Sequence, residues 1–141
     1  MKHVLPQLLF VLAALALAVA SVACRGGDVE GPPIELQQQD RDQITRMTSD
    51  YLAALDARDM AKAMAQLPAG VPNATVTKAM DTFENEGYQL VSIGDITVDG
   101  QDVVVTLNLK DKTGKAITRT FEFRIDQGQW KLWSPQLKLP A

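Results

Sequence analysis

Reactive side chains are few in this chain, and two of them lie near its N-terminus. Cys24 is its one cysteine and His3 is its one histidine. A charged start at Lys2 and His3, an apolar run over residues 8–20 and small residues up to Ala23 are the parts of a secretory signal in their usual order. Cleavage before Cys24 would remove His3 and leave the thiol at the new N-terminus. Such a mature chain could not build a zinc site from imidazole and thiolate, a serine–histidine triad or a cysteine–histidine pair.

The stretch from Ala20 to Cys24 resembles the lipobox of bacterial lipoproteins, apart from Ser21, which stands where that motif usually has leucine. The resemblance implies cleavage before Cys24, acylation of its thiol by long chains such as palmitate, and attachment to the lipid bilayer. Several acyl chains hold a protein on a membrane far better than one chain does. The expected location is therefore the cell envelope, on the outer leaflet of the plasma membrane. In a bacterium with two membranes, Arg25 also permits the outer membrane, because it is not the aspartate associated with inner-membrane retention.

Two other interpretations of the leader stay open. Ordinary signal-peptidase cleavage after Ala20 or Ala23 would export a protein with one unpaired thiol. An uncleaved anchor would rely on an apolar run that is shorter than the roughly 20 residues needed to span a bilayer. Lipidation accounts best for the single cysteine, because it converts the thiol to a thioether.

The sequence divides into a leader, a tether and one domain. Residues 1–23 are the predicted signal peptide, residues 24–40 are a flexible tether rich in Gly, Pro, Gln and acids, and residues 41–141 are a single folded domain. The formal net charge is −3 and the basic residues are scattered, so we expect no nucleic-acid partner. The acidic residues do not have the spacing of a calcium loop, and we expect neither a metal nor a cofactor.

Apolar residues recur at helical spacing in the first half of the domain. A first helix is predicted from Arg41, with a buried stripe at Ile44, Met47, Thr48, Tyr51, Leu52 and Leu55. Asp59 is the predicted N-cap of a short second helix that ends at Pro68. A third helix is predicted to start within residues 73–75 and to end at Gly87 as its C-terminal cap.

From Tyr88 onward the apolar spacing is two, and three turn signals predict four antiparallel strands in a meander. The predicted turns are Asp99-Gly100, residues 112–114 and Gln127-Gly128. The predicted cross-strand neighbours are Val98 with Gln101, Ile96 with Val103, Leu109 with Ile117, Leu107 with Arg119, Val105 with Phe121, Val103 with Phe123, Ile125 with Trp130 and Phe123 with Leu132. These registers place the apolar side chains on one face, and a bulge at Gly94-Asp95 would bend the sheet.

Three helices followed by a bent antiparallel sheet predict an α+β domain with the helices in the concave face of the sheet. At Tyr51 to Asp59 (YLAALDARD) and Phe121 to Trp133 (FEFRIDQGQWKLW), the chain is similar to the nuclear-transport-factor-2-like, or cystatin-like, superfamily. Within it, the chain resembles small bacterial lipoproteins of unknown function. The resemblance covers about residues 41–135 and implies a cone-shaped domain, although the strand that several members have between the second and third helices is missing. The superfamily hosts isomerases, dehydratases and binding modules, so the fold alone selects no activity.

The candidate ligand pocket lies inside the predicted cone and consists of Tyr51, Arg119, Phe121 and Trp130. The resemblance implies that catalytic members carry an aspartate, histidine or tyrosine there, whereas the inward strand positions of this chain are aliphatic or aromatic apart from Arg119. That arginine can bind a carboxylate or phosphate, or it can pack its stem and pair its head with an acid. Tyr51 can offer its hydroxyl to a ligand, or it can lie in the core with the hydroxyl bonded.

The function predicted from the sequence is that of a membrane-tethered, non-catalytic binding module for a small apolar ligand or an envelope protein partner. Two alternatives stay open. One is an isomerase- or dehydratase-like enzyme that uses Tyr51 and Arg119, and the other is a structural or immunity-type interaction protein. No catalytic residue is assigned. The protein is expected to be a monomer or dimer that meets the bilayer through acylated Cys24.

Overall fold

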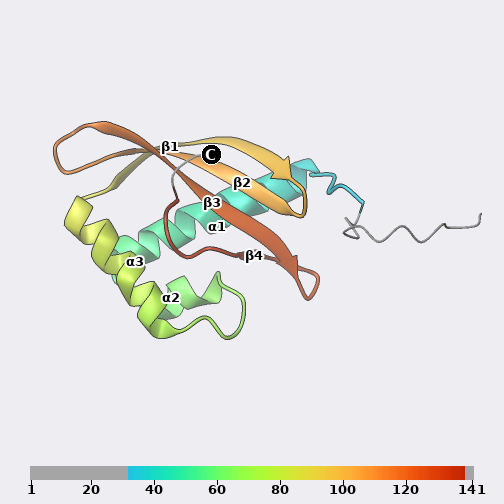
Figure 1. Cartoon of the computed structure of the whole chain (residues 1–141), viewed down its shortest axis with the longest axis horizontal. Helices are drawn as coiled ribbons and strands as arrows, with labels where there is room; N and C mark the ends of the chain where they lie inside the picture. Colours follow the sequence, from blue (N-terminus) through green and yellow to red (C-terminus); the bar gives the residue numbers. More distant parts are fainter. Residues whose placement is uncertain (1–31, 139–141) are drawn as a thin grey trace, which may run out of the picture.

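The computed structural model describes residues 32–138, in which three helices precede a four-stranded antiparallel sheet (Figure 1). The elements are α1 (Gln38–Asp56), α2 (Met60–Ala65), α3 (Asn73–Glu86), β1 (Gln89–Asp99), β2 (Asp102–Lys110), β3 (Ala116–Asp126) and β4 (Gln129–Leu132). The strands lie in the sheet in chain order, as a meander does. The predicted α+β class, with three helices packed against a four-stranded antiparallel sheet, is confirmed.

The helices follow the predicted apolar stripes and caps. The buried residues of α1 are Ile44, Thr48, Tyr51, Leu52, Ala54 and Leu55. The helix begins at Gln38 rather than at the predicted Arg41, because the Asp40 carboxylate accepts a hydrogen bond from the backbone N–H of Gln37 (3.0 Å) and caps the first turn. Asp59 caps α2 by accepting from the backbone N–H of Lys62 (3.1 Å). Apolar spacing and polar caps therefore predicted the buried faces of these helices and the start of α2, but not the start of α1.

The second and third hairpins have the predicted register. β2 pairs with β3 so that Leu109 lies opposite Ile117 and Val105 opposite Phe121. β3 pairs with β4 so that Ile125 lies opposite Trp130. The bulge predicted at Gly94-Asp95 is also present, because the β1–β2 register shifts between Ile93 and Ile96. Apolar alternation and turn chemistry agree at these places, so the predictions were correct.

The register predicted for the first hairpin was wrong. Val98 lies opposite Val103, and Ile96 lies opposite Val105. The loop is therefore Gly100-Gln101, with a positive φ of 60° at Gly100 only, which suits a type II′ turn rather than type I′. This register sets Val98 against a valine instead of the polar Gln101, and cross-strand apolar pairs stabilise a sheet. The shift involves an even number of residues, so the predicted faces of both strands are retained.

The core lies between the helices and the sheet. The fully buried strand residues include Val103, Val105, Leu107, Leu109, Phe121, Phe123 and Leu132. On the opposite face, Trp133 is 41% exposed and stacks under the guanidinium of Arg124, which is paired with Asp102. Within the described residues, the segment between α2 and α3 contains no strand, in line with the departure predicted from the superfamily. A single backbone bond from Leu132 N–H to Gln66 C=O (2.9 Å) lies there instead.

Candidate functional site

The predicted lipidation site Cys24, the signal peptide and most of the predicted tether lie outside the described residues. The end of that tether is described: Ile34 and Leu36 are half-buried and pack against the core. None of the helices within residues 32–138 is long and apolar enough to cross a bilayer. In the same part of the chain, His, Cys, Asp and Glu side chains do not gather in threes as a metal site would require.

Tyr51 lies on the buried stripe of α1, and its hydroxyl already has an acceptor. The side chain is fully buried, and the hydroxyl donates to the backbone C=O of Pro135 at 2.7 Å. The ring meets Phe121 edge-on, with centroids 5.5 Å apart at an interplanar angle of 74°. Burial raises the pKa of the Tyr51 phenol far above its usual value, so the hydroxyl stays protonated and acts as a donor. The group is a core tyrosine whose polar end binds the C-terminal segment.

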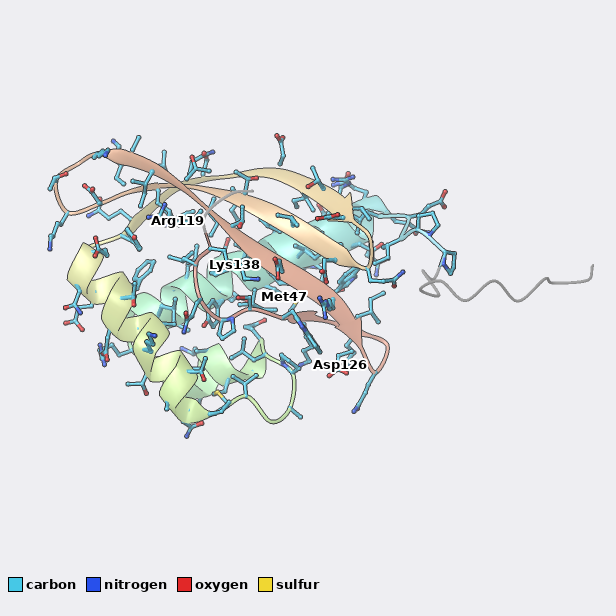
Figure 2. All side chains as sticks on the ribbon, viewed as in Figure 1. Met47, Arg119, Asp126 and Lys138 are labelled. Atoms are coloured by element: carbon cyan, nitrogen blue, oxygen red, sulfur yellow. The ribbon has the colours of Figure 1, made fainter. Side chains whose placement is uncertain are left out.

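Arg119 lies opposite Leu107, as predicted, and is half-buried near the start of β3 (Figure 2). Its Nη1 donates to the C=O of Thr118 at 2.9 Å, and its Nη2 lies 3.4 Å from the Tyr88 hydroxyl. The guanidinium carbon also lies 5.9 Å from the centre of the Tyr88 ring, which permits a cation–π contact. Among residues 32–138, its guanidinium forms no ion pair with a carboxylate. Arg119 is therefore the one charged residue of the predicted pocket, and within the described residues no carboxylate neutralises its charge.

Trp130 and Phe121 are both core residues. Phe121 is fully buried, and Trp130 is 6% exposed with its indole N–H donating to the Asp40 carboxylate at 3.0 Å. That hydrogen bond, with a second one from the Gln37 N–H, lowers the pKa of Asp40. Trp130 thus connects β4 to the first turn of α1. Along the helix axis, Asp40 lies roughly 16 Å from Tyr51, because an α-helix rises by about 1.5 Å per residue.

The structure brings together only part of the predicted pocket. Tyr51 contacts Phe121, Arg119 contacts Tyr88, and Trp130 binds near the other end of α1. The sequence did not indicate Tyr88, Pro135 or Asp40 as partners. A backbone carbonyl such as that of Pro135 has no residue type to mark it, and Asp40 was assigned to the tether. Asp40 carried one signal, because an aspartate directly before a predicted helix is a common N-cap.

The surface grooves of the described residues include four with volumes between about 330 and 500 Å³. The groove between α1 and α2 has a volume of about 500 Å³ and is lined by Asp50, Ala53, Ala54, Ala57, Asp59, Lys62, Ala65 and Gln66. Two grooves of about 350 and 330 Å³ share Asp56, Phe83, Tyr88 and Gln89 at the C-terminal ends of α1 and α3. The fourth, of about 410 Å³, lies between α2 and the β3–β4 turn. Tyr51, Arg119, Phe121 and Trp130 line none of these four.

Three solved bacterial structures resemble this arrangement of helices and sheet. A protein of unknown function with a cystatin-like fold from Nostoc punctiforme aligns with a TM-score of 0.54 and 12% identity, over 77% of this chain and 96% of its own. An NTF2-like protein of unknown function from Methylobacillus flagellatus aligns with a TM-score of 0.55 and 16% identity, over 79% of this chain and 100% of its own. The chain has a cystatin-like, NTF2-like fold.

A third structural neighbour is a protein from Novosphingobium aromaticivorans that is provisionally named an aromatic ring hydroxylase. It aligns with a TM-score of 0.50 and 15% identity, over 76% of this chain and 93% of its own. No protein-family model matches the chain, and no curated protein matches it either. At these identities the likeness establishes the fold and leaves the activity to be argued from the residues.

Proposed function

We propose that this protein is a lipid-anchored envelope protein whose NTF2-like domain binds a partner and does not catalyse a reaction. The observation that argues against catalysis, and thereby favours a binding role, is the filling of the concave side of the sheet. Apart from the half-buried Arg119, its inward residues are aliphatic and aromatic, and the hydroxyl of Tyr51, which packs on them from α1, already donates to the Pro135 C=O. Acid–base catalysis needs a titratable group within reach of a substrate proton, and this filled face offers none.

A protein partner is better supported than a small ligand inside the cone. The buried side chains of the described residues leave no polar atom without a hydrogen-bond partner, so nothing inside calls for a polar ligand. The alanine-lined groove between α1 and α2 is the candidate site for a small apolar ligand. An isomerase- or dehydratase-like enzyme would need Tyr51 and Arg119 to face one cavity, and neither lines any of the four grooves. The name of the Novosphingobium protein does not alter this, because the likeness concerns the fold.

The envelope anchor rests on the sequence around Cys24, and intact mass spectrometry of protein purified from membranes tests it. The expected product starts at Cys24 and carries the added mass of acyl chains. Cys24→Ser is the matched control, and it should lose the acyl mass and the processed N-terminus together. A soluble product with a free thiol at residue 24 would contradict the anchor.

The binding role is tested separately, by cross-linking in intact membranes followed by purification of the protein. We expect one or more envelope proteins to be cross-linked at stoichiometric yield. Ala57→Arg, which changes the groove between α1 and α2, is compared with Thr113→Arg in the exposed β2–β3 loop. If the anchored protein forms no cross-linked product, the binding role is contradicted, whereas the proposed anchor is not.

A further inference from the structure

After β4 the chain continues in the same direction and meets β3 again at Thr120, farther along the same edge (Figure 1). We name residues 134–138 the C-terminal strap. The N–H of Trp133 donates to the C=O of Glu122 at 2.7 Å, and Lys138 pairs with Thr120 through two backbone bonds of 2.8 and 3.1 Å. β4 pairs with β3 only from Phe123 onward, so the earlier half of that edge would otherwise be open. The strap therefore closes this part of the sheet edge through the backbone of one residue, Lys138.

The strap also meets α1 and the core. The Pro135 C=O accepts from the Tyr51 hydroxyl, and Leu137 is half-buried against the core residues. The strap thus makes three kinds of contact: backbone hydrogen bonds to the edge of β3, one carbonyl that accepts from Tyr51, and one aliphatic side chain packed on the core. Those are the features by which an extended peptide binds when it adds a strand to a sheet, with backbone bonds for affinity and side-chain pockets for specificity.

The strap is held by few interactions. It has one bridge with β3, whereas β2 and β3 pair continuously from Val103 to Lys110. Its one ion pair, Lys138 with Glu122, is 46% and 26% exposed and therefore weak in water. Segments with few buried contacts and exposed backbone bonds are the ones that open locally while the rest stays folded. The strap can thus detach while the rest of the domain stays folded.

Opening would leave groups that need new partners. The Tyr51 hydroxyl would lose its acceptor while its ring stays among core residues, and the N–H and C=O of Thr120 would be unpaired. A buried polar group without a partner is unfavourable, so an incoming chain that supplies a carbonyl is favoured over an empty site. Arg119 lies next to Thr120 in β3, is half-buried, and donates from its guanidinium to the Thr118 C=O. A carboxylate beyond the strap position would meet that charge.

We propose that the edge of β3 around Thr120, with the Tyr51 hydroxyl and the apolar site of Leu137, is a peptide-binding groove that the protein's own strap fills until a partner replaces it. Its ligand is an extended segment of a protein partner, with an aliphatic residue at the Leu137 position and an acid toward Arg119. The proposal deepens the binding role proposed above and rests on it.

A partner peptide suits the groove better than the strap of a second copy. Only Ser134 separates the last bond of the β4 strand, at Trp133, from the first strap contact, at Pro135. Exchange between two copies would need a longer hinge or the unpairing of Trp133, because so short a link cannot bridge two domains. A free extended segment needs neither.

A labelled synthetic peptide with the sequence of residues 133–138 is the probe, and the full chain with Leu137→Asp is the receptor. The aspartate loosens the strap, and Gln136→Asp is the matched control because Gln136 is exposed and its charge change is the same. We expect the peptide to bind the Leu137→Asp chain at least about tenfold more tightly than the control, since freeing the site raises the fraction of competent protein. A peptide whose leucine is replaced by alanine should bind at least about tenfold more weakly than the original, because its aliphatic contact is lost.

The unaltered chain gives a second measurement, which stays valid if Leu137→Asp does not fold. Its Lys138 amide should exchange hydrogen faster than the amide of Val105, and the peptide should shift the Thr120 amide resonance. Equal protection of Lys138 and Val105, or no binding up to about 1 mM, would overturn the peptide groove. A dimer that forms by exchange of straps in ultracentrifugation would overturn the assignment to a partner. Failure of the peptide to bind would leave the cross-linked envelope partner and the acylated Cys24 unaffected.

Discussion

Replacing Phe121 with alanine distinguishes a packed core from a ligand pocket on the concave side of the sheet. Phe121 is fully buried, and its ring centre lies 5.5 Å from that of Tyr51. Truncating such a phenylalanine costs about 3–5 kcal/mol, because the removed atoms lose their burial and leave a cavity. A domain is typically stable by about 5–15 kcal/mol, so this variant should lose a large share of its free energy of unfolding.

The assay is urea unfolding monitored by the fluorescence of Trp130 and Trp133, together with a thermal melt. We expect the melting temperature to fall by at least about 12 °C, because each kcal/mol shifts it by about 4–8 °C in a domain of this size. Ile125→Ala is the matched control. Ile125 lies on the same strand and face but is 54% exposed, so its truncation should cost about 1 kcal/mol or less.

A small effect would refute the packed-core reasoning. If Phe121→Ala costs less than about 1 kcal/mol with an unchanged denaturant slope, the ring borders water rather than other side chains. The concave side would then contain a real pocket, and the small-ligand and enzyme interpretations would regain support. If the reasoning is right, the new cavity should be apolar and should bind benzene, which would raise the melting temperature of the variant alone.

Three further predictions concern caps and turns. The pKa of Asp40 is lowered by the Trp130 indole N–H, so its stabilisation is complete above about pH 5 and is lost progressively as the pH falls further. Asp40→Asn should therefore flatten the decline in unfolding free energy between about pH 5 and 2, and an unchanged decline would contradict the pairing. Gln127 has a φ of 51°, so Gln127→Asn should raise the free energy of unfolding by up to about 1 kcal/mol. Gly87→Ala should lower the free energy of unfolding more than Gly100→Ala. Both glycines have positive φ, but a Cβ at Gly87 would lie 2.7 Å from a side-chain atom of the β2–β3 loop, whereas a Cβ at Gly100 would have no neighbouring atom within 4 Å. Urea unfolding checks both turn predictions, and equal costs at the two glycines would show that the close approach is relieved.

Local patterns were enough to predict most of the fold. The three-to-four-residue spacing around Ile44 and Tyr51, and the caps at Asp59 and Gly87, depend on interactions within a few residues. Two hairpin registers followed from turn chemistry combined with alternation. The first hairpin was misplaced because Asp99-Gly100 and Gly100-Gln101 are both acceptable turns, and only the pairing of Val98 with Val103 distinguishes them.

The candidate site depended on contacts that no local pattern carries. The order of residues alone indicated an apolar concave face with Arg119 as its one charged member, and it predicted acylation of Cys24. The partners of Tyr51 and Trp130, 84 and 90 residues away, emerge only when the strap and α1 fold onto the sheet. Alternation tells which face a side chain lies on, whereas the tertiary structure decides what fills the space above it. Here the filling is the protein's own helices and C-terminal strap, because closing a sheet edge with its own chain satisfies backbone groups that would otherwise need water or a partner.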